Sequence, residues 1–270
     1  MKTRFEEWIK RVDMACEAME QVGQTYNGAK NVPKEQFVFL DILKRIKANL
    51  RGCRDMLFEL TKLDPEKDNF EKKIPLSILL RSCLADAMVG MYLASLTKQE
   101  FAEELDVINL DFVRYMGSMI PLEVELYNRL SGREINFQEE LDIRYDGFCQ
   151  FLSSDKGKPW TYNKASVFRA DKTNDKRVDF PLIRKYLIES EAETQAFAYM
   201  YNYYRYYSQY EHFTSIGREI WSTEFAEEIT RMEMSLISVI HSCYLIAKKL
   251  PNATDDLLKP FVVVINSIVP

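Results

Sequence analysis

Hydrophobic residues recur along most of this chain at alternating steps of three and four, the spacing of one face of an α-helix. Short loops separate the first of these segments, so neighbouring helices are expected to run antiparallel. The sequence therefore predicts an all-α fold, an antiparallel helical bundle of about six or seven helices. The clearest apolar seams lie within residues 5–19, 39–60, 75–97, 101–126, 190–217 and 222–250.

The segment Pro75 to Thr97 is predicted to be the central helix of the bundle. Its only charged residues are Arg81 and Asp86, so most of its circumference should be buried. These two residues lie about 140° apart round a helix axis, and each is expected to face a different neighbouring helix. The seam becomes small towards its end, at Ala87, Gly90 and Ala94, which should let a neighbour approach closely.

The next seam passes through Gly117 and Pro121, which predicts a long helix that is kinked or broken there. After Gly132 the periodicity fades. Residues 133–180 are predicted to form an insertion or long loop within a single helical domain that covers residues 1–270. Loops of this length inside a compact domain are usually functional or mobile.

Residues 190–217 are unusually rich in tyrosine, and two helical stripes can be traced along them. One stripe is apolar and predicts a buried seam: Ala192, Ala196, Tyr199, Tyr203, Tyr206, Tyr210 and Phe213. The second lies about 200° round the axis and is expected to face water or a partner: Tyr201, Arg205, Ser208 and His212. At the end of the chain, the pattern of residues 255–270 fits a helix or a strand.

Composition and charge indicate how large a hydrophobic core the chain can bury and which partners it can bind. With 270 residues, of which 47% are hydrophobic, the chain can bury a sizeable core. Its net charge of −5 and pI near 5.4 argue against a role in coating DNA. The segment from Asp155 to Lys185, however, contains nine basic residues and four acidic ones. This segment is a candidate phosphate-binding loop, or else a solvated surface loop; the candidate residues are Lys164, Arg169, Lys172, Lys176 and Arg177.

The start of the chain is charged and has no apolar signal region. The sequence contains no uninterrupted run of about 18 apolar residues, so no membrane span is predicted. Of the five cysteines, four fall on apolar seams, where free cysteines act as small hydrophobic residues. We therefore expect a cytoplasmic protein without a membrane segment.

The sequence contains no glycine-rich phosphate loop, no nucleophile elbow and no paired Cys-x-x-Cys motif. With two histidines in the chain, a histidine-rich metal site is not expected, and no cofactor is predicted. The remaining candidate catalytic residues are Arg205, Ser208 and His212. Ser208 and His212 are one helical turn apart, and Arg205 and His212 are about 10 Å apart along the axis. An imidazole can move a proton at a ribose oxygen, and a guanidinium can hold a phosphate.

The run from Arg205 to His212 resembles the signature of the HEPN superfamily, an arginine and a histidine separated by four to six residues. Many members of this all-helical superfamily are metal-independent endoribonucleases. The chain also resembles a bacterial helical family of unknown function, through Arg81-Ser82-Cys83-Leu84 and through Tyr204, Ser208 and His212 at steps of four. The resemblance covers two helices. It implies that Arg205 and His212 are catalytic, that they face their own copies across a homodimer, and that RNA is the partner.

A second interpretation is a non-catalytic module for protein interaction or ligand binding. In that case Arg81 or Asp86 of the central helix pairs with Arg205 or His212 in a structural polar network, with His241 nearby. Such networks fix how helices pack without performing chemistry. Exposure of His212 would favour the enzyme.

Overall fold

A computed structural model of the protein describes residues 2–27, 37–62, 70–132, 134–136, 139, 143, 183–184, 198–209 and 225–268. Helices account for nearly all of these residues, and no strand occurs among them, which confirms the predicted all-α fold. The chain divides into two compact units: Met1–Ser95 with Phe180–Pro270, and Leu96–Asp179. Most of the predicted insertion at 133–180 lies outside the described residues.

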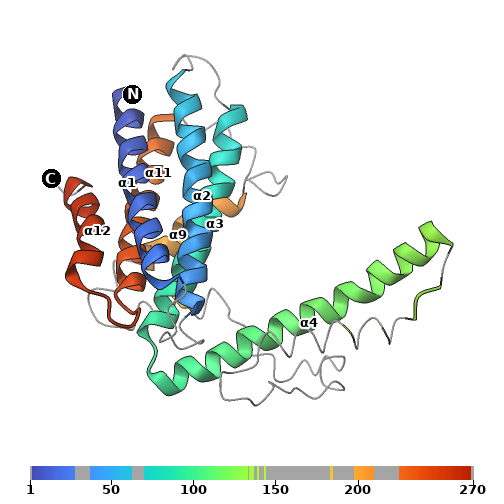
Figure 1. The fold of residues 1–270 in the computed structure, drawn as a ribbon. Helices are drawn as coiled ribbons and strands as arrows, with labels where there is room; N and C mark the ends of the chain where they lie inside the picture. Colours follow the sequence, from blue (N-terminus) through green and yellow to red (C-terminus); the bar gives the residue numbers. More distant parts are fainter. Residues whose placement is uncertain are drawn as a thin grey trace. The chain divides into compact units, whose positions relative to one another are not determined.

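In the first unit, the helices α1 (Lys2–Tyr26), α2 (Phe37–Thr61) and α3 (Phe70–Ser95) form consecutive antiparallel pairs (Figure 1). Asp13 pairs with Arg54, whereas Glu20, further along α1, pairs with Lys47, which comes earlier on α2. α3 begins at Phe70, ahead of Pro75, where the sequence placed its start. This part of the bundle follows the predicted antiparallel order.

α11 (Phe225–Ala247) runs in the same direction as α3, because Lys73 pairs with Glu228 near the start of both helices and Gly90 meets Ile246 near their ends. α9 (Ala198–Ser208) runs the opposite way, since its end contacts Glu228 and its start contacts Ser242. Neighbouring helices are therefore not antiparallel throughout the bundle.

The last segment of the chain is a helix, α12 (Asp255–Ile268), which settles the choice between helix and strand. Leu258, Phe261 and Val264 form its buried face, and they recur with the spacing of a helix. α12 packs against α1 and α11, and Arg11 of α1 donates a hydrogen bond to the carbonyl of Ser267 at 2.9 Å. The apolar end of the chain thus packs back onto its own bundle.

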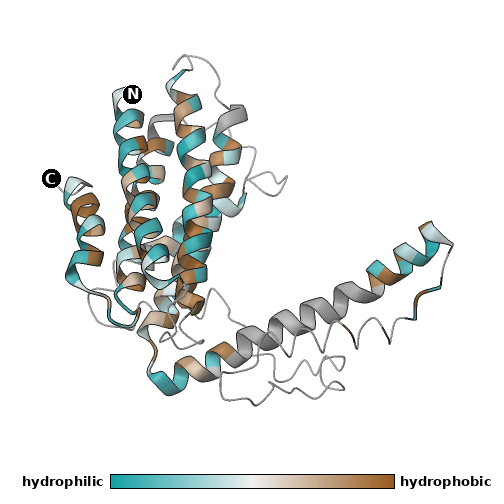
Figure 2. Ribbon diagram, in the orientation of Figure 1, coloured by the Kyte–Doolittle hydropathy of each residue, from teal (hydrophilic) through white to brown (hydrophobic). Residues whose placement is uncertain are grey.

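The core follows the seams that the sequence predicts for α2, α3 and α11. Figure 2 shows hydrophilic and hydrophobic positions alternating round α1 and α2. Four cysteines, one from each of four helices, are buried and free: Cys16, Cys53, Cys83 and Cys243. Burial raises the pKa of the Cys16 thiol to about 12. These thiols therefore serve as small apolar core residues, as predicted; Cys149 lies outside the described residues.

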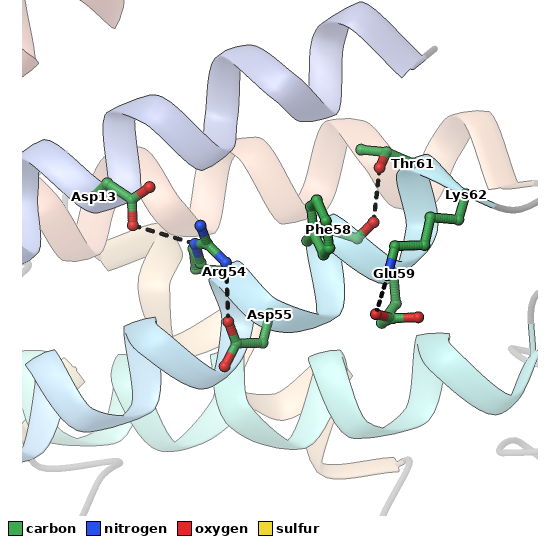
Figure 3. A network of polar contacts seen from close by, with 7 residues as sticks. All are labelled: Asp13, Arg54, Asp55, Phe58, Glu59, Thr61 and Lys62. Atoms are coloured by element: carbon green, nitrogen blue, oxygen red, sulfur yellow. Dashed lines mark hydrogen bonds and ion pairs between the residues drawn. The ribbon is translucent and has the colours of Figure 1, made fainter.

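The outer surface of α1 and α2 carries polar contacts instead of core packing. Figure 3 shows Arg54 of α2 between Asp13 of α1 and Asp55, with N–O distances of 3.3 and 3.2 Å. The ring of Phe58 is 44% exposed, and it lies beneath the Arg54 guanidinium and the Lys62 ammonium. Two cations thus lie over an exposed aromatic ring on this face.

One described segment, Lys73–Ser95 of α3, is long and apolar enough to cross a membrane by length and composition. Of its most apolar window, 56% is buried inside the structure. Core helices of bundles share these properties, so the prediction that the protein has no membrane segment stays a prediction.

The second unit contains α4 (Lys98–Ser131), one continuous helix through Gly117 and Pro121, so it is not broken there. Thr97 caps its first turn, where the Thr97 hydroxyl accepts from the Glu100 amide and the Glu100 carboxylate accepts from the Thr97 amide. Gly132 ends the helix in the left-handed conformation, with φ at 65°. Leu122 and Leu126, which the sequence assigned to a buried seam, are 60% and 57% exposed.

The close approach at Gly90 predicts an unusual response to alanine. A Cβ atom at Gly90 would overlap with Cδ1 of Ile246, and it would lie 3.0 Å from Cγ1 of Ile246 and 3.2 Å from Cγ2 of Ile42; both isoleucines are buried. Alanine normally stabilises a helix interior by about 1 kcal/mol relative to glycine. Here overpacking should outweigh that gain, so that Gly90→Ala lowers the free energy of unfolding by about 1–2 kcal/mol net. Denaturant unfolding measures the change.

The matched control is Gly23→Ala in α1, where nothing lies within 4 Å of the added Cβ. This variant should gain stability by about 0.5–1 kcal/mol. Equal gains in both variants would show that α3 and α11 are not in contact at Gly90.

Candidate functional site

The candidate site is built on α9, and this helix buries a different face from the predicted one. Met200 and Tyr207 are buried, whereas Tyr199 of the predicted seam is 66% exposed. The buried face is thus displaced by one residue, about 100° round the axis. Tyrosine explains the error, because an apolar ring with a hydroxyl suits both the core and the surface, and tyrosines occur on every side of α9.

The central contact of the site joins α3 to α9 through Arg81. Arg81 Nε donates to Ser208 Oγ at 2.9 Å, and Arg81 Nη2 donates to the Tyr204 hydroxyl at 3.4 Å. The guanidinium carbon also lies 5.1 Å from the centre of the Tyr204 ring. Ser208 in turn donates its hydroxyl proton to the Tyr204 carbonyl at 2.8 Å. Ser208 therefore holds α9 against α3, and its single proton is already used within the helix.

A row of rings and cations extends from this contact. The rings of Tyr204 and Tyr201 are 6.4 Å apart, and the guanidinium of Arg184 lies 5.6 Å from the Tyr201 ring centre. Arg184 is exposed, next to the buried Ile183. Residues 183–184, α9 and α3 thus place two guanidiniums and two tyrosine rings in a row, in the order Arg184, Tyr201, Tyr204 and Arg81.

Arg205 is exposed on the outer side of α9, one turn after Tyr201. Within the described part of the chain, its guanidinium makes no hydrogen bond or ion pair, and its backbone carbonyl accepts from Gln209 at 3.4 Å. Arg205 and Ser208, which the sequence placed on one outward stripe, therefore differ in environment. Arg205 faces away from the core, and Ser208 faces α3.

Several candidate residues lie outside the described residues: His212 and the basic loop residues Lys164, Arg169, Lys172, Lys176 and Arg177. Asp86, the other charge of α3, pairs with Arg45 of α2 at 3.0 Å, and its burial raises the pKa of its carboxyl. Arg81 and Asp86 do face different neighbours, as predicted. The ring of His241 on α11 lies 6.4 Å from that of Tyr244.

Next to this site the structure contains a buried charged cluster that the sequence analysis missed. Lys73 of α3 and Glu228 of α11 pair at 3.7 Å, and their side chains are 9% and 7% exposed. The Tyr206 hydroxyl donates to Glu228, and Arg231 donates to Tyr206 at 3.3 Å. The sequence holds a partial signal for Lys73, since Lys73, Ser77 and Arg81 follow one another at steps of four on one face of α3, but nothing in it identifies Glu228 as the partner.

A small pocket of about 20 Å³ lies beside this pair, enough for one water molecule. Apolar side chains provide most of its lining, and its polar lining comes from Lys73, Ser77, Tyr207 and Glu228. Burial raises the pKa of the Tyr207 hydroxyl well above its ordinary value, and the negative charge of Glu228 adds to the rise. The pocket is too small for a nucleotide or another organic ligand, so it belongs to the packing of the bundle.

The contacts of Arg81 predict that it stabilises the attachment of α9. Arg81→Ala removes a charged hydrogen bond to Ser208 and the stacking of the guanidinium on the Tyr204 ring, both at a half-buried position. It should lower the free energy of unfolding by about 2–3 kcal/mol. Arg81→Lys should recover less than half of this loss, because an ammonium cannot both stack on Tyr204 and reach Ser208. Urea unfolding measures both variants. Arg51→Ala, which breaks an exposed pair with Glu20, should change stability by less than about 1 kcal/mol.

Comparison of the chain with protein-family models, with curated proteins and with solved structures found no match.

Proposed function

We propose that this protein is a HEPN-like, metal-independent endoribonuclease in which Arg205 and His212 act on a phosphodiester of RNA. The observation that supports the proposal most directly is the exposure of Arg205 on the outer side of α9. Arg205 lies one helical turn after Tyr201, whose ring stacks with the Arg184 guanidinium. Tyrosine rings flanked by guanidiniums suit RNA, because cations hold phosphates and rings stack on unpaired bases. An RNA strand is thus the ligand that this surface fits best.

In this proposal the ribose supplies the nucleophile. The His212 imidazole takes the proton of the 2′-hydroxyl, the 2′-oxygen attacks the adjacent phosphorus, and the bond from phosphorus to the 5′-oxygen breaks. The 5′-oxygen leaves with a proton from solvent, to which the His212 imidazole returns the proton that it took, giving a 2′,3′-cyclic phosphate and a 5′-hydroxyl. Arg205 holds the phosphate oxygens and stabilises the negative charge that develops on them. The reaction consumes no water, so its products carry a signature that hydrolysis does not leave.

Ser208 and Arg81 have a positioning role in this proposal. The Ser208 hydroxyl donates to Tyr204 and accepts from Arg81, so it is engaged on both sides. Together these contacts fix the rotation of α9 relative to α3 and keep Arg205 on the outer face. Lys164, Arg169, Lys172, Lys176 and Arg177 remain candidates for contacts with the RNA backbone.

Incubation of the purified chain with an end-labelled single-stranded RNA in excess EDTA tests the proposal. We expect cleavage, with products that mass spectrometry identifies as a 2′,3′-cyclic phosphate and a 5′-hydroxyl. A DNA strand of the same sequence should remain intact, because it lacks the 2′-hydroxyl. RNA that stays intact under these conditions would overturn the proposal, and so would cleavage that leaves 5′-phosphates.

The alternative is a non-catalytic module for protein interaction or ligand binding. It is favoured by the way Arg81 ties Tyr204 and Ser208 together inside the bundle, as a purely structural network would. A stable protein that neither cuts nor binds RNA would support this alternative. Loss of RNA binding in Arg205→Ala would instead assign the α9 surface to RNA even without cleavage.

A further inference from the structure

The C-terminal half of α4 exposes a row of leucines. Leu122, Leu126 and Leu130 follow one another at steps of four and are 60%, 57% and 77% exposed, with Tyr127 beside them at 43%. Figure 2 shows hydrophobic positions in this part of the helix. Single exposed leucines are common, but a row of three along one helix is typical of an interaction site.

The opposite face of the same helix is already used within the chain. Val124 is buried, and the Asn128 side chain forms two hydrogen bonds with the backbone of Ile135, at 2.8 and 3.3 Å. The cap at Gly132 fixes the end of the helix one turn later. The leucine row thus lies on a helix end that is fixed by its cap, and it points away from the face that contacts the rest of the chain.

The charges at the edge of the leucine row indicate which partner fits. Glu125 and Arg129 are exposed and lie one turn apart along the same edge. In an antiparallel pair of identical helices, the same edge of each copy meets, so each Glu125 would lie near Arg129 of the other copy. In a parallel pair, this edge would instead meet the edge that carries Glu123, which brings two carboxylates together.

From this self-complementary pattern we infer that the leucine face of α4 binds the same face of a second copy of the chain, antiparallel, about a two-fold axis level with Tyr127, midway between Glu125 and Arg129. With the axis there, Glu125 lies level with the opposing Arg129, and the two copies of Glu125 are about 6 Å apart along the helices. The seam that the sequence predicts through Leu122 and Leu126 is then buried in the dimer and not in the monomer. This inference concerns the second unit and does not rest on the proposed ribonuclease activity.

Sedimentation equilibrium of the full chain, at concentrations up to about 100 µM, tests the inference. We expect the wild-type chain to dimerise. Leu126→Glu should raise the dissociation constant at least about tenfold, since it places two carboxylates at the centre of an apolar contact. Val263→Glu is the matched control: it puts the same charge on an exposed valine of α12 and should leave the dissociation constant unchanged.

Charge reversal tests the antiparallel arrangement. Glu125→Arg alone should weaken the dimer several-fold, because it opposes two guanidiniums, and Arg129→Glu alone should do the same. The double variant Glu125→Arg/Arg129→Glu should restore wild-type association, since it exchanges the two charges. Because Glu125 and Arg129 are exposed, their variants still test the inference if circular dichroism shows that Leu126→Glu does not fold. A wild-type chain that stays monomeric, a Leu126→Glu variant that dimerises normally, or a double variant that stays weak would each overturn the inference.

Discussion

Replacing Arg205 with alanine is expected to lower the rate of RNA cleavage roughly 10²- to 10³-fold, the usual cost of removing one group that stabilises a developing oxyanion. Replacing His212 should cost roughly 10²- to 10⁴-fold, because proton transfer is lost as well. Single-turnover rates in EDTA measure both effects. Because Arg205 is exposed and its side chain makes no polar contact within the described part of the chain, the thermal stability of Arg205→Ala should match the wild type.

Arg51→Ala serves as the control for loss of one positive charge. Arg51 is exposed on α2 and pairs with Glu20, away from α9. Its rate of cleavage should be within about twofold of the wild type, since general electrostatic attraction of RNA depends on many charges. If Arg205→Ala and Arg51→Ala lower the rate equally, Arg205 contributes only net charge, and the proposed role at the phosphate is wrong.

Removal of the Glu228 carboxylate should have the largest effect on stability. Glu228→Ala removes the carboxylate that pairs with the buried Lys73 ammonium and that accepts from the Tyr206 hydroxyl. Loss of one partner from a buried ion pair typically costs about 3–5 kcal/mol. We therefore expect the free energy of unfolding to fall by that amount, measured by urea unfolding at pH 7.

The decisive comparison is the double variant Lys73→Met/Glu228→Leu. Both charges are then replaced by apolar groups of similar size, which is commonly neutral or stabilising. The Tyr206 hydroxyl loses its acceptor here too, but it is half-buried and can donate to water. The double variant should be within about 1 kcal/mol of the wild type, or more stable, although Glu228→Ala alone is severely destabilised. Lys44→Ala, which breaks an exposed pair with Asp41, should cost less than about 0.5 kcal/mol. If Glu228→Ala costs no more than Lys44→Ala, Lys73 and Glu228 are not buried together.

The sequence was sufficient for the parts of the fold that depend on simple apolar periodicity. The seam residues of α2 between Phe39 and Leu60 are all buried, and so are those from Ile229 of α11 to Leu250, which follows the helix. The small residues at the end of α3 were read correctly, because Gly90 does meet Ile246 closely. Leucine, isoleucine and valine have no polar group, so their spacing identifies an apolar face, but the exposed Leu122 and Leu126 of α4 show that such a face is not always buried within one chain.

The same reasoning failed where side chains are amphipathic. Tyrosines surround α9, so periodicity could not distinguish its buried face from its exposed one, and Tyr199 was assigned to the wrong side. The contact from Arg81 to Ser208 joins residues 127 positions apart, and nothing local marks it. Lys73 and Glu228 were overlooked for a similar reason, since a charge becomes informative only when its burial and its partner are known.

Helix directions have a consequence for how the chain is organised. α9 runs opposite to α3 and α11, so the chain leaves α3 and enters α9 towards the same end of the bundle. The whole segment Leu96–Asp179, which is the second compact unit, is inserted between the two parts of the first unit. We therefore expect that this segment can be lengthened, replaced or removed without changing the path of the chain through the first unit.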